Sequence, residues 1–270
     1  MNTKVSIEQT FYVVRSQGRA ALMPYFTIGY PDIDTSIAII QAMAASGADL
    51  IELGIPFSDP LADGPTIQQS TQIALRSGVT LEICLHTLQR LRQSGVSTPL
   101  LLMGYYNPII SFGEERFAKL AAEGGAQGII IPDLPPEESE DLRLSCNQVG
   151  LSLIHLVAPT TPLQRIRFIA EKSQGFIYVV SVTGVTGARQ SLPQDLIDFI
   201  RSVRSVSALP LALGFGISTP QQAATYGRYV DGVIVGSALI EKVRQSDRPV
   251  RAAAEFVRSF RLAMENGCSN

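Results

Sequence analysis

Short apolar runs alternate with amphipathic stretches along all 270 residues of the chain. The apolar runs are rich in β-branched residues and nearly free of polar positions, which is typical of parallel strands buried on both faces. The stretches between them have the periodicity of helices that cover such a sheet. Eight strands are expected, at residues 22–27, 50–53, 100–103, 128–131, 151–156, 176–180, 209–213 and 232–235.

The junctions between the expected helices and strands repeat as well. Residues 45–51, 122–130 and 226–234 each combine the end of a helix, a glycine turn and the start of a strand. A recurring βα unit and eight strands predict an α/β fold, a TIM (β/α)8 barrel that forms a single domain over residues 1–270. A doubly wound sheet has the same alternation, but the number of strands and the late position of the glycine loops favour the barrel.

More helices are expected than one for each strand. Residues 66–77 and 80–93 both follow the second strand, residues 4–17 precede the first strand, and residues 250–265 end the chain. The barrel should therefore have extra helices at the N-terminus, after strand 2 and at the C-terminus. The remaining helices are expected at residues 35–46, 115–123, 136–149, 163–172, 192–205 and 219–226.

Composition excludes several classes of function. The net charge is −2 and no long basic run is present, so nucleic acid is not an expected partner. No apolar run approaches the roughly 18 residues that span a bilayer, and the first residues lack the apolar core of a secretory signal. The three cysteines (Cys84, Cys146 and Cys268) lie far apart and have no metal-ligand spacing. We therefore expect a cytoplasmic protein without a metal site.

Residues 51–65 combine an apolar strand with a loop rich in proline and glycine, and they contain three carboxylates. Glu52 lies inside the strand, where a carboxylate is costly unless it is paired or takes part in chemistry. Asp59 and Asp63 lie on the loop, so two carboxylates in different environments could share acid–base work. The alternative is structural: Glu52 would pair with a buried arginine or lysine, and the aspartates would only form turns.

Three glycine-containing loops follow the last three strands. Residues 181–189, 214–218 and 236–237 offer backbone N–H groups, hydroxyls and the start of a helix. Such groups bind anions, and in βα barrels the late loops at the C-terminal ends of the strands commonly hold a phosphate. The sequence therefore predicts a phosphate site, with Arg189 left in solvent outside it.

Other polar residues near the strand ends have two possible roles each. Tyr178 could direct its hydroxyl to Glu52 or to a substrate, or it could pack in the core. Asp133 could position a substrate or cap the helix that follows it. His155 could line the pocket, whereas His86 belongs to an amphipathic helix and is expected at the surface or in the core.

Several motifs together resemble one family. These motifs occur in the same order as in the tryptophan synthase alpha subunit family, and the chain is similar to that family over about residues 21–242. The motifs are IELGIPFSDPLADGPTIQ at 51–68, IPDLPPEES at 131–139, TGVTGAR at 183–189, GFGIS at 214–218 and VGS at 235–237.

The resemblance implies a TIM barrel that cleaves indole-3-glycerol phosphate to indole and glyceraldehyde 3-phosphate. It also implies an alpha2beta2 heterotetramer with a PLP-dependent beta subunit, which receives indole through a tunnel, while the alpha chain holds no cofactor. By motif position, Glu52 and Asp63 match the catalytic carboxylates and Tyr178 the tyrosine near the glutamate. The phosphate binders match Gly187, Gly216, Gly236 and Ser237, and the contacts of the indole ring match Tyr25, Ile67 and Phe215.

The chain departs from the family pattern in places. Val182 stands where many relatives have a polar residue, and residues 103–108 follow one of two forms that the family shows at a surface expected to face the partner. Residues 56–65 and 182–192 are expected to close over the substrate. Two alternatives share this sequence: a stand-alone lyase that releases free indole, and a non-catalytic subunit that activates a beta partner. The retained Glu52 and Asp63 argue against the second.

Overall fold

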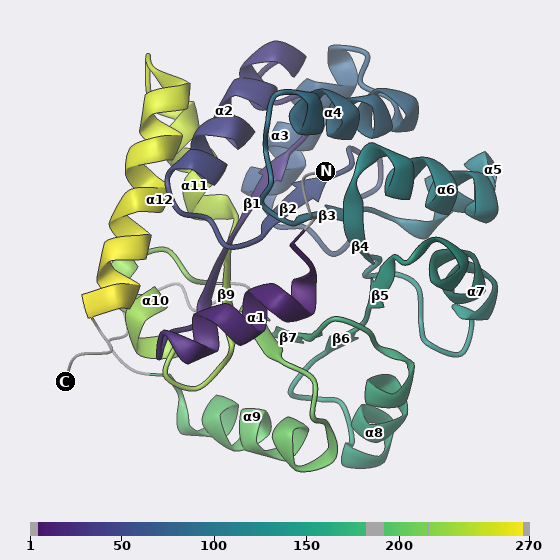
Figure 1. Cartoon of the computed structure of the whole chain (residues 1–270), viewed down its shortest axis with the longest axis vertical. Coiled ribbons are helices and arrows are strands. Elements are labelled where there is room, and N and C mark those ends of the chain that lie inside the picture. The colour runs from purple at the N-terminus through teal and green to yellow at the C-terminus, as the bar shows by residue number, and fades with distance from the viewer. Residues whose placement is uncertain (1–4, 182–191, 215, 267–270) are drawn as a thin grey trace.

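Parallel strands form one sheet in the order β5-β4-β3-β2-β1-β9-β8-β7-β6. The computed structural model describes residues 5–181, 192–214 and 216–266, and over these residues the strands form a ring enclosed by helices (Figure 1). The barrel predicted from the sequence is confirmed. The strands other than β5 and β6 are β1 Ala21–Thr27, β2 Ile51–Gly54, β3 Leu100–Met103, β4 Ala126–Ile130, β7 Ile177–Val180, β8 Leu211–Gly214 and β9 Gly232–Val235.

The fifth expected strand, residues 151–156, is interrupted. It forms β5 Ser152–Ile154 and β6 Leu156–Val157, with His155 between them, so the described residues contain nine strands rather than eight. The reason is a change of neighbour: β5 pairs with β4, whereas β6 pairs with β7. The His155 carbonyl accepts a hydrogen bond from the N–H of Tyr178 at 3.0 Å, so this one interrupted strand closes the ring.

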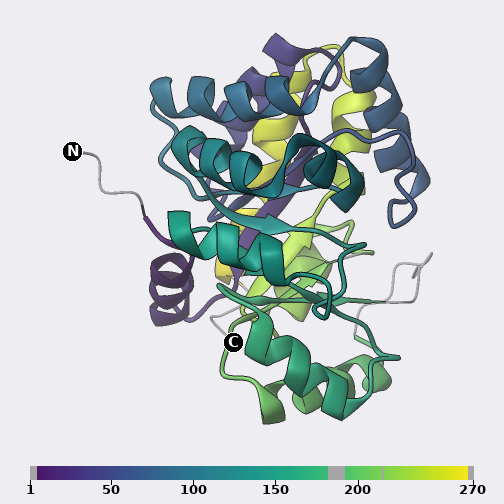
Figure 2. The same ribbon diagram turned by 90° about the vertical axis from the view of Figure 1, so that its right-hand side faces the viewer.

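Helices cover the outside of the barrel, as the two perpendicular views show (Figures 1 and 2). The extra helices are confirmed at the N-terminus, after the second strand and at the C-terminus, as α1, α3 and α12. None of the described helices has the length and apolar character that crossing a bilayer requires. The helices are α1 Ile7–Ser16, α2 Ile33–Ala45, α3 Pro65–Arg76, α4 Leu81–Gln93, α5 Tyr106–Phe112, α6 Glu114–Gly124, α7 Glu140–Val149, α8 Leu163–Lys172, α9 Gln194–Val206, α10 Pro220–Tyr226, α11 Ser237–Arg244 and α12 Pro249–Asn266.

Two helices that differ from expectation have prolines in or before their first turn. The short helix α5 was not predicted, yet Pro108 lies in its first turn, where a missing N–H group costs no hydrogen bond. Helix α7 begins at Glu140 instead of residue 136. Before it, the N–H groups of Glu138 and Ser139 donate to the carbonyls of Pro135 and Pro136, so these residues form turns.

The two ends of the barrel have different contents. Helix α1 crosses the N-terminal end (Figure 1), and its buried side chains Ile7 and Phe11 close that end. A Cβ atom added at Gly128 would lie 3.1 Å from Ile7, and one added at Gly232 would lie 3.2 Å from Phe11. The C-terminal end, where the βα loops meet, is left for a cavity.

Candidate active site

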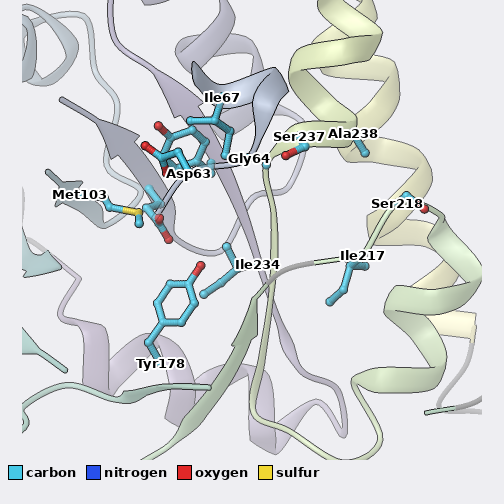
Figure 3. A pocket seen from close by; sticks show the side chains of 14 residues that line it. Asp63, Gly64, Ile67, Met103, Tyr178, Ile217, Ser218, Ile234, Ser237 and Ala238 are labelled. Atoms are coloured by element: carbon cyan, nitrogen blue, oxygen red, sulfur yellow. The ribbon is translucent and has the colours of Figure 1, made fainter. Parts of the chain in front are cut away.

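A cavity of about 380 Å³ lies among the side chains at the C-terminal ends of the strands. In Figure 3, Asp63 and Ile67 lie on one side of it and Ser237 and Ser218 on the other, with the ring of Tyr178 below. Eight residues predicted for the site line this one cavity: Tyr25, Glu52, Asp63, Ile67, Tyr178, Gly216, Gly236 and Ser237. The other two, Gly187 and Phe215, lie outside the described residues.

Glu52 is buried at the inner wall of the barrel. Its register neighbours are Tyr25 on β1 and Leu101 on β3, and the residue is only 1% exposed. Within the described part of the chain, neither carboxylate oxygen of Glu52 has a hydrogen-bond partner. Burial, and then the charge of Asp63, raise the pKa of Glu52 to about 8. The structural alternative, a buried ion pair to an arginine or lysine, therefore does not hold among these residues.

Asp63 approaches the cavity from the loop between β2 and α3. Its N–H group donates to the Pro60 carbonyl at 3.0 Å, and its own carbonyl accepts from the side chain of Gln68 at 2.9 Å. Burial raises the pKa of Asp63 to about 6, while a hydrogen bond from Tyr105 acts in the opposite direction. The cavity thus contains one carboxyl group that is mostly protonated near neutral pH and one that is mostly ionised.

Two buried tyrosines flank Glu52, and each lies against a glycine on the neighbouring strand. A Cβ atom added at Gly54 would lie 2.0 Å from the Tyr25 hydroxyl oxygen, and one added at Gly214 would lie 2.3 Å from that of Tyr178. Burial raises the pKa of both tyrosines well above the ordinary value, and the nearby carboxylates add to this rise, mainly Asp63 at Tyr25 and Glu52 at Tyr178. Both hydroxyls therefore stay protonated and can only donate or accept hydrogen bonds.

The opposite wall of the cavity is formed by the start of a helix. Gly236 and Ser237 begin α11, and no side chain among the described residues caps this N-terminus. Gly216, at a φ of +76°, turns the loop after β8 toward the same wall. Uncapped N–H groups and the positive end of the helix dipole give this wall the chemistry of an anion site.

The sequence analysis missed several residues of the cavity. Met103 and Ile234 could have been found, because each lies two residues along its strand from a position that faces the interior. Tyr105 does not line the cavity but donates a hydrogen bond to Asp63, and periodicity could not find it because it lies after the strand. Of the other lining residues, Ile217 and Ser218 belong to the predicted phosphate loop and Gly64 to the loop expected to close, although none of the three was singled out, and Ala238 was missed.

Asp133 and His155 lie elsewhere. The Asp133 carboxylate accepts from the N–H of Tyr106 at 3.0 Å, so it caps α5 and not the helix that follows it. His155 is buried and lines a separate cavity of about 250 Å³ with Asp133 and Arg165, so the expectation that it could line the main pocket was wrong. Burial lowers the pKa of His155 to about 4. His86 is exposed on α4.

No group of three or more histidine, cysteine, aspartate or glutamate side chains among the described residues is placed to hold a metal ion. The polar groups that line the cavity are carboxyl groups, hydroxyls and backbone N–H groups. A protonated carboxyl group can donate a proton and an ionised one can accept it, while the helix start can bind an anion.

Comparisons with known proteins identify the family. A family model described as the tryptophan synthase alpha chain matches residues 11–268. The tryptophan synthase alpha chain of Roseiflexus sp. (strain RS-1) is 50% identical over 257 residues, which cover 94% of this chain and 98% of that protein. The tryptophan synthase alpha chain of Chloroflexus aggregans is 51% identical over 263 residues, which cover 96% and 98%. A chain in a structure of Mycobacterium tuberculosis tryptophan synthase has a TM-score of 0.89 at 36% identity, covering 96% of this chain and 98% of that one. The chain therefore belongs to the tryptophan synthase alpha chain family.

Proposed function

We propose that the barrel is a carbon–carbon lyase that cleaves indole-3-glycerol phosphate to indole and glyceraldehyde 3-phosphate, in a single domain. The observation that carries this proposal is the buried Glu52, whose carboxyl group faces the cavity without a hydrogen-bond partner among the described residues. Asp63 lies in the same cavity with a lower pKa, so the two groups can act as a pair.

The cavity is divided in a way that suits this substrate. We assign the phosphate to the start of α11, where Gly236 and Ser237 offer N–H groups and a hydroxyl, with Gly216 and Gly187 as further contacts. We assign the indole ring to the apolar part of the cavity. Its lining there consists of Tyr25, Ile67 and Met103, and Phe215 is proposed to contact the ring as well.

The first chemical step is tautomerisation of the indole ring. Glu52 is protonated at neutral pH because its pKa is raised to about 8, and it donates this proton to C3 of the ring. Asp63 accepts the proton of the indole N–H group, so the ring becomes an indolenine. The bond between C3 and the glyceryl chain can then break, because the C=N bond accepts the electron pair.

The second step is the retro-aldol cleavage. The Glu52 carboxylate takes the proton of the glyceryl hydroxyl, and the carbonyl of glyceraldehyde 3-phosphate forms as the C–C bond breaks. The electron pair returns through the ring to nitrogen, which recovers its proton from Asp63. Both carboxyl groups end in their starting states, and Tyr178 is assigned to orient Glu52 or the hydroxyl that Glu52 deprotonates.

We propose that the partner is a tryptophan synthase beta subunit, in an alpha2beta2 heterotetramer that passes indole to the PLP of the beta subunit. The alpha chain itself uses no cofactor in this scheme. Residues 56–65 close over the substrate, and the partner biases that closure. The other segment expected to close, 182–192, lies outside the described residues except for its last residue.

The test is indole release from indole-3-glycerol phosphate by the purified chain, with and without a tryptophan synthase beta subunit. Slow release by the chain alone and a large increase with the partner is the expected result. Fast release that the partner leaves unchanged would instead identify a stand-alone lyase. No release in either condition would overturn the proposed activity.

A further inference from the structure

Tyr105 connects two segments at the edge of the cavity. It follows β3, is 5% exposed, and its hydroxyl accepts a hydrogen bond from the N–H of Ala62 at 3.0 Å. The same hydroxyl donates to the carboxylate of Asp63. Its ring packs against Phe57, with the ring centroids 5.3 Å apart and the planes tilted by 30°. One side chain therefore contacts the Asp63 loop at its beginning and at its end.

The backbone under Tyr105 is held in place from another loop. Asp133, which follows β4, accepts from the N–H of Tyr106 with its two oxygens, at 3.0 and 3.3 Å. A carboxylate at a helix N-terminus satisfies a free N–H group and interacts favourably with the helix dipole. The first residue of α5 is thus anchored, and with it the position of Tyr105.

Apart from Tyr105, the loop that carries Asp63, residues 57–63, has few restraints from outside it: the Gln68 side chain donates to the Asp63 carbonyl at 2.9 Å, and Pro60 is buried. The loop backbone forms its own turns, from the N–H of Leu61 to Asp59 and from that of Asp63 to Pro60. Leu61 is 95% exposed and therefore contributes almost no packing. The Gln68 bond holds the backbone of Asp63 and leaves its carboxylate free to sample several positions unless a further side chain restrains it.

We propose that Tyr105 is a positioning residue for Asp63, fixing the place of its carboxylate at the cavity through the paired hydrogen bonds to Ala62 and Asp63. This inference rests on the proposed function, because it assigns Asp63 to the chemical step. Asp133 is the anchor of this arrangement and not a contact of the substrate.

Tyr105 also keeps Asp63 ionised. Burial raises the pKa of Asp63, and the hydrogen bond from Tyr105 opposes that rise by stabilising the carboxylate. The other titratable groups that face this carboxylate are Tyr25, Glu52 and Tyr178. None of these three groups carries a positive charge. Of the four groups that face Asp63, the Tyr105 hydroxyl is therefore the one that favours its ionised form.

The test compares Tyr105→Phe with Tyr106→Phe. Phenylalanine at 105 keeps the ring against Phe57 and removes only the hydroxyl. Tyr106 is a matched control, because its hydroxyl donates to Glu114 at 2.8 Å, away from the cavity. Loss of a hydrogen bond to a charged group should lower the kcat/KM of indole release by about 10- to 100-fold in Tyr105→Phe. Tyr106→Phe should match the wild type.

A second readout separates positioning from general destabilisation. Carboxyl 13C NMR titration should place the pKa of Asp63 above its wild-type value of about 6 in Tyr105→Phe and leave it unchanged in Tyr106→Phe. The acidic limb of the pH–rate profile should move to higher pH in the same variant. Unchanged titration and unchanged kcat/KM would overturn the proposal. If the wild type released no indole, the proposed function would fail, but the titration would still decide whether Tyr105 controls Asp63.

Discussion

At the scale of single residues, function and stability compete at Glu52. Its carboxyl group is 1% exposed and lacks a partner among the described residues, and burying such a group lowers the free energy of unfolding. The same burial gives it a pKa near neutrality, which acid–base chemistry requires. Strand periodicity places Glu52 on the same face as Leu50 and Gly54, but it does not say whether that face points into the barrel. The absence of a partner depends on which side chains surround it in space, so the sequence left that question open.

The variant Glu52→Gln should lose cleavage and gain stability. The folded chain keeps the Glu52 proton up to about pH 8, whereas the unfolded chain releases it near pH 4.5. Between these values the folded state binds more protons, so the free energy of unfolding of the wild type falls as pH rises. Glutamine does not titrate and so removes this loss of stability, and the variant should be more stable than the wild type by about 4 kcal/mol at pH 8. Urea denaturation at several pH values measures the difference, which should shrink toward pH 4.5.

The variant Asp63→Asn tests whether the two carboxyl groups interact. In the wild type, kcat/KM should rise through about pH 6 as Asp63 ionises and fall above about pH 8 as Glu52 loses its proton. Asparagine should lower the rate by about 10²–10⁴-fold, the usual contribution of an acid–base group. It should also lower the pKa of Glu52, because the charge of Asp63 contributes to the raised value. A carboxyl titration that gave the same Glu52 pKa in both proteins would contradict this coupling.

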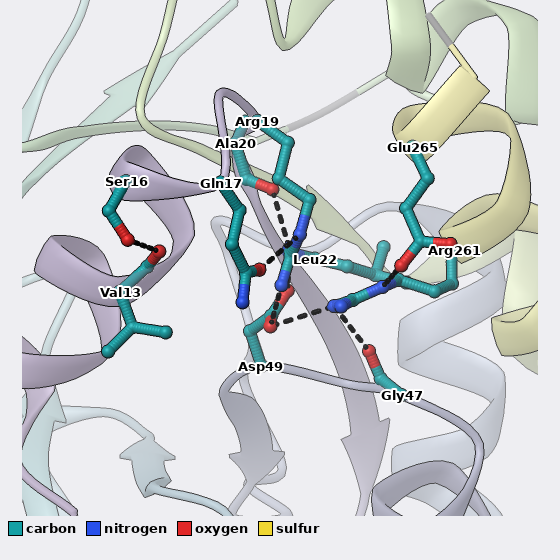
Figure 4. A network of polar contacts seen from close by, with 10 residues as sticks. All are labelled: Val13, Ser16, Gln17, Arg19, Ala20, Leu22, Gly47, Asp49, Arg261 and Glu265. Atoms are coloured by element: carbon teal, nitrogen blue, oxygen red, sulfur yellow. Dashed lines mark hydrogen bonds and ion pairs between the residues drawn. The ribbon is translucent and has the colours of Figure 1, made fainter. Parts of the chain in front are cut away.

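At the scale of elements, a buried ionic network ties three parts of the fold together at the N-terminal end of the barrel (Figure 4). Asp49, before β2, accepts from both terminal nitrogens of Arg19 at 2.7 and 2.8 Å and from Arg261 of α12 at 2.9 Å. It also accepts from the N–H of Leu22 in β1 at 2.8 Å. The Arg19 side chain is 5% exposed and that of Asp49 11%, so water screens this network little.

We expect Asp49→Asn to destabilise the protein by about 3–5 kcal/mol, because it leaves the buried charge of Arg19 without its counter-ion. The exposed pair of Asp34 and Arg90 is the control, since its side chains are 77% and 51% exposed. Asp34→Asn should cost less than about 1 kcal/mol. Denaturant unfolding of both variants measures the difference. Indole release per folded molecule should stay at the wild-type rate, and a lost rate in folded Asp49→Asn would show that the network acts on the cavity.

Helices and strands could be predicted where their own residues show the periodicity of apolar and polar side chains that defines them. Strand β3 coincides with the expected residues 100–103, and helix α8 coincides with 163–172, because a local run of side chains defines both. The break at His155 was not predictable, since it results from two different neighbouring strands. The contact of Tyr105 with Ala62 spans 43 residues and joins two loops, and no periodic pattern records such a contact.

At the scale of the whole molecule, the barrel separates stability from chemistry. The ionic network of Asp49 and the side chains of α1 close the N-terminal end, while the cavity and the uncapped start of α11 occupy the other end. This division lets the C-terminal end of the barrel carry Glu52, whose carboxyl group has no partner among the described residues, and the uncapped start of α11 without loss of the fold. It also predicts that one substitution can affect the two properties in opposite directions.

Ser237→Asp is that substitution. It is made in the Glu52→Gln background, in which we expect indole-3-glycerol phosphate to bind without being cleaved. Without substrate, a carboxylate at the first residue of α11 should stabilise the fold by about 0.3–1 kcal/mol through the helix dipole. It should also repel the substrate phosphate from the same N–H groups. At a substrate concentration of 100 times Kd, the Glu52→Gln protein should gain about 2.7 kcal/mol and its Tm should rise by roughly 5 °C or more. The double variant should show little of this increase.

Leu163→Asp, at the start of α8 and away from the cavity, is the control and should keep the full increase in Tm with substrate. An equal rise of Tm in all three proteins would place the phosphate somewhere other than the start of α11.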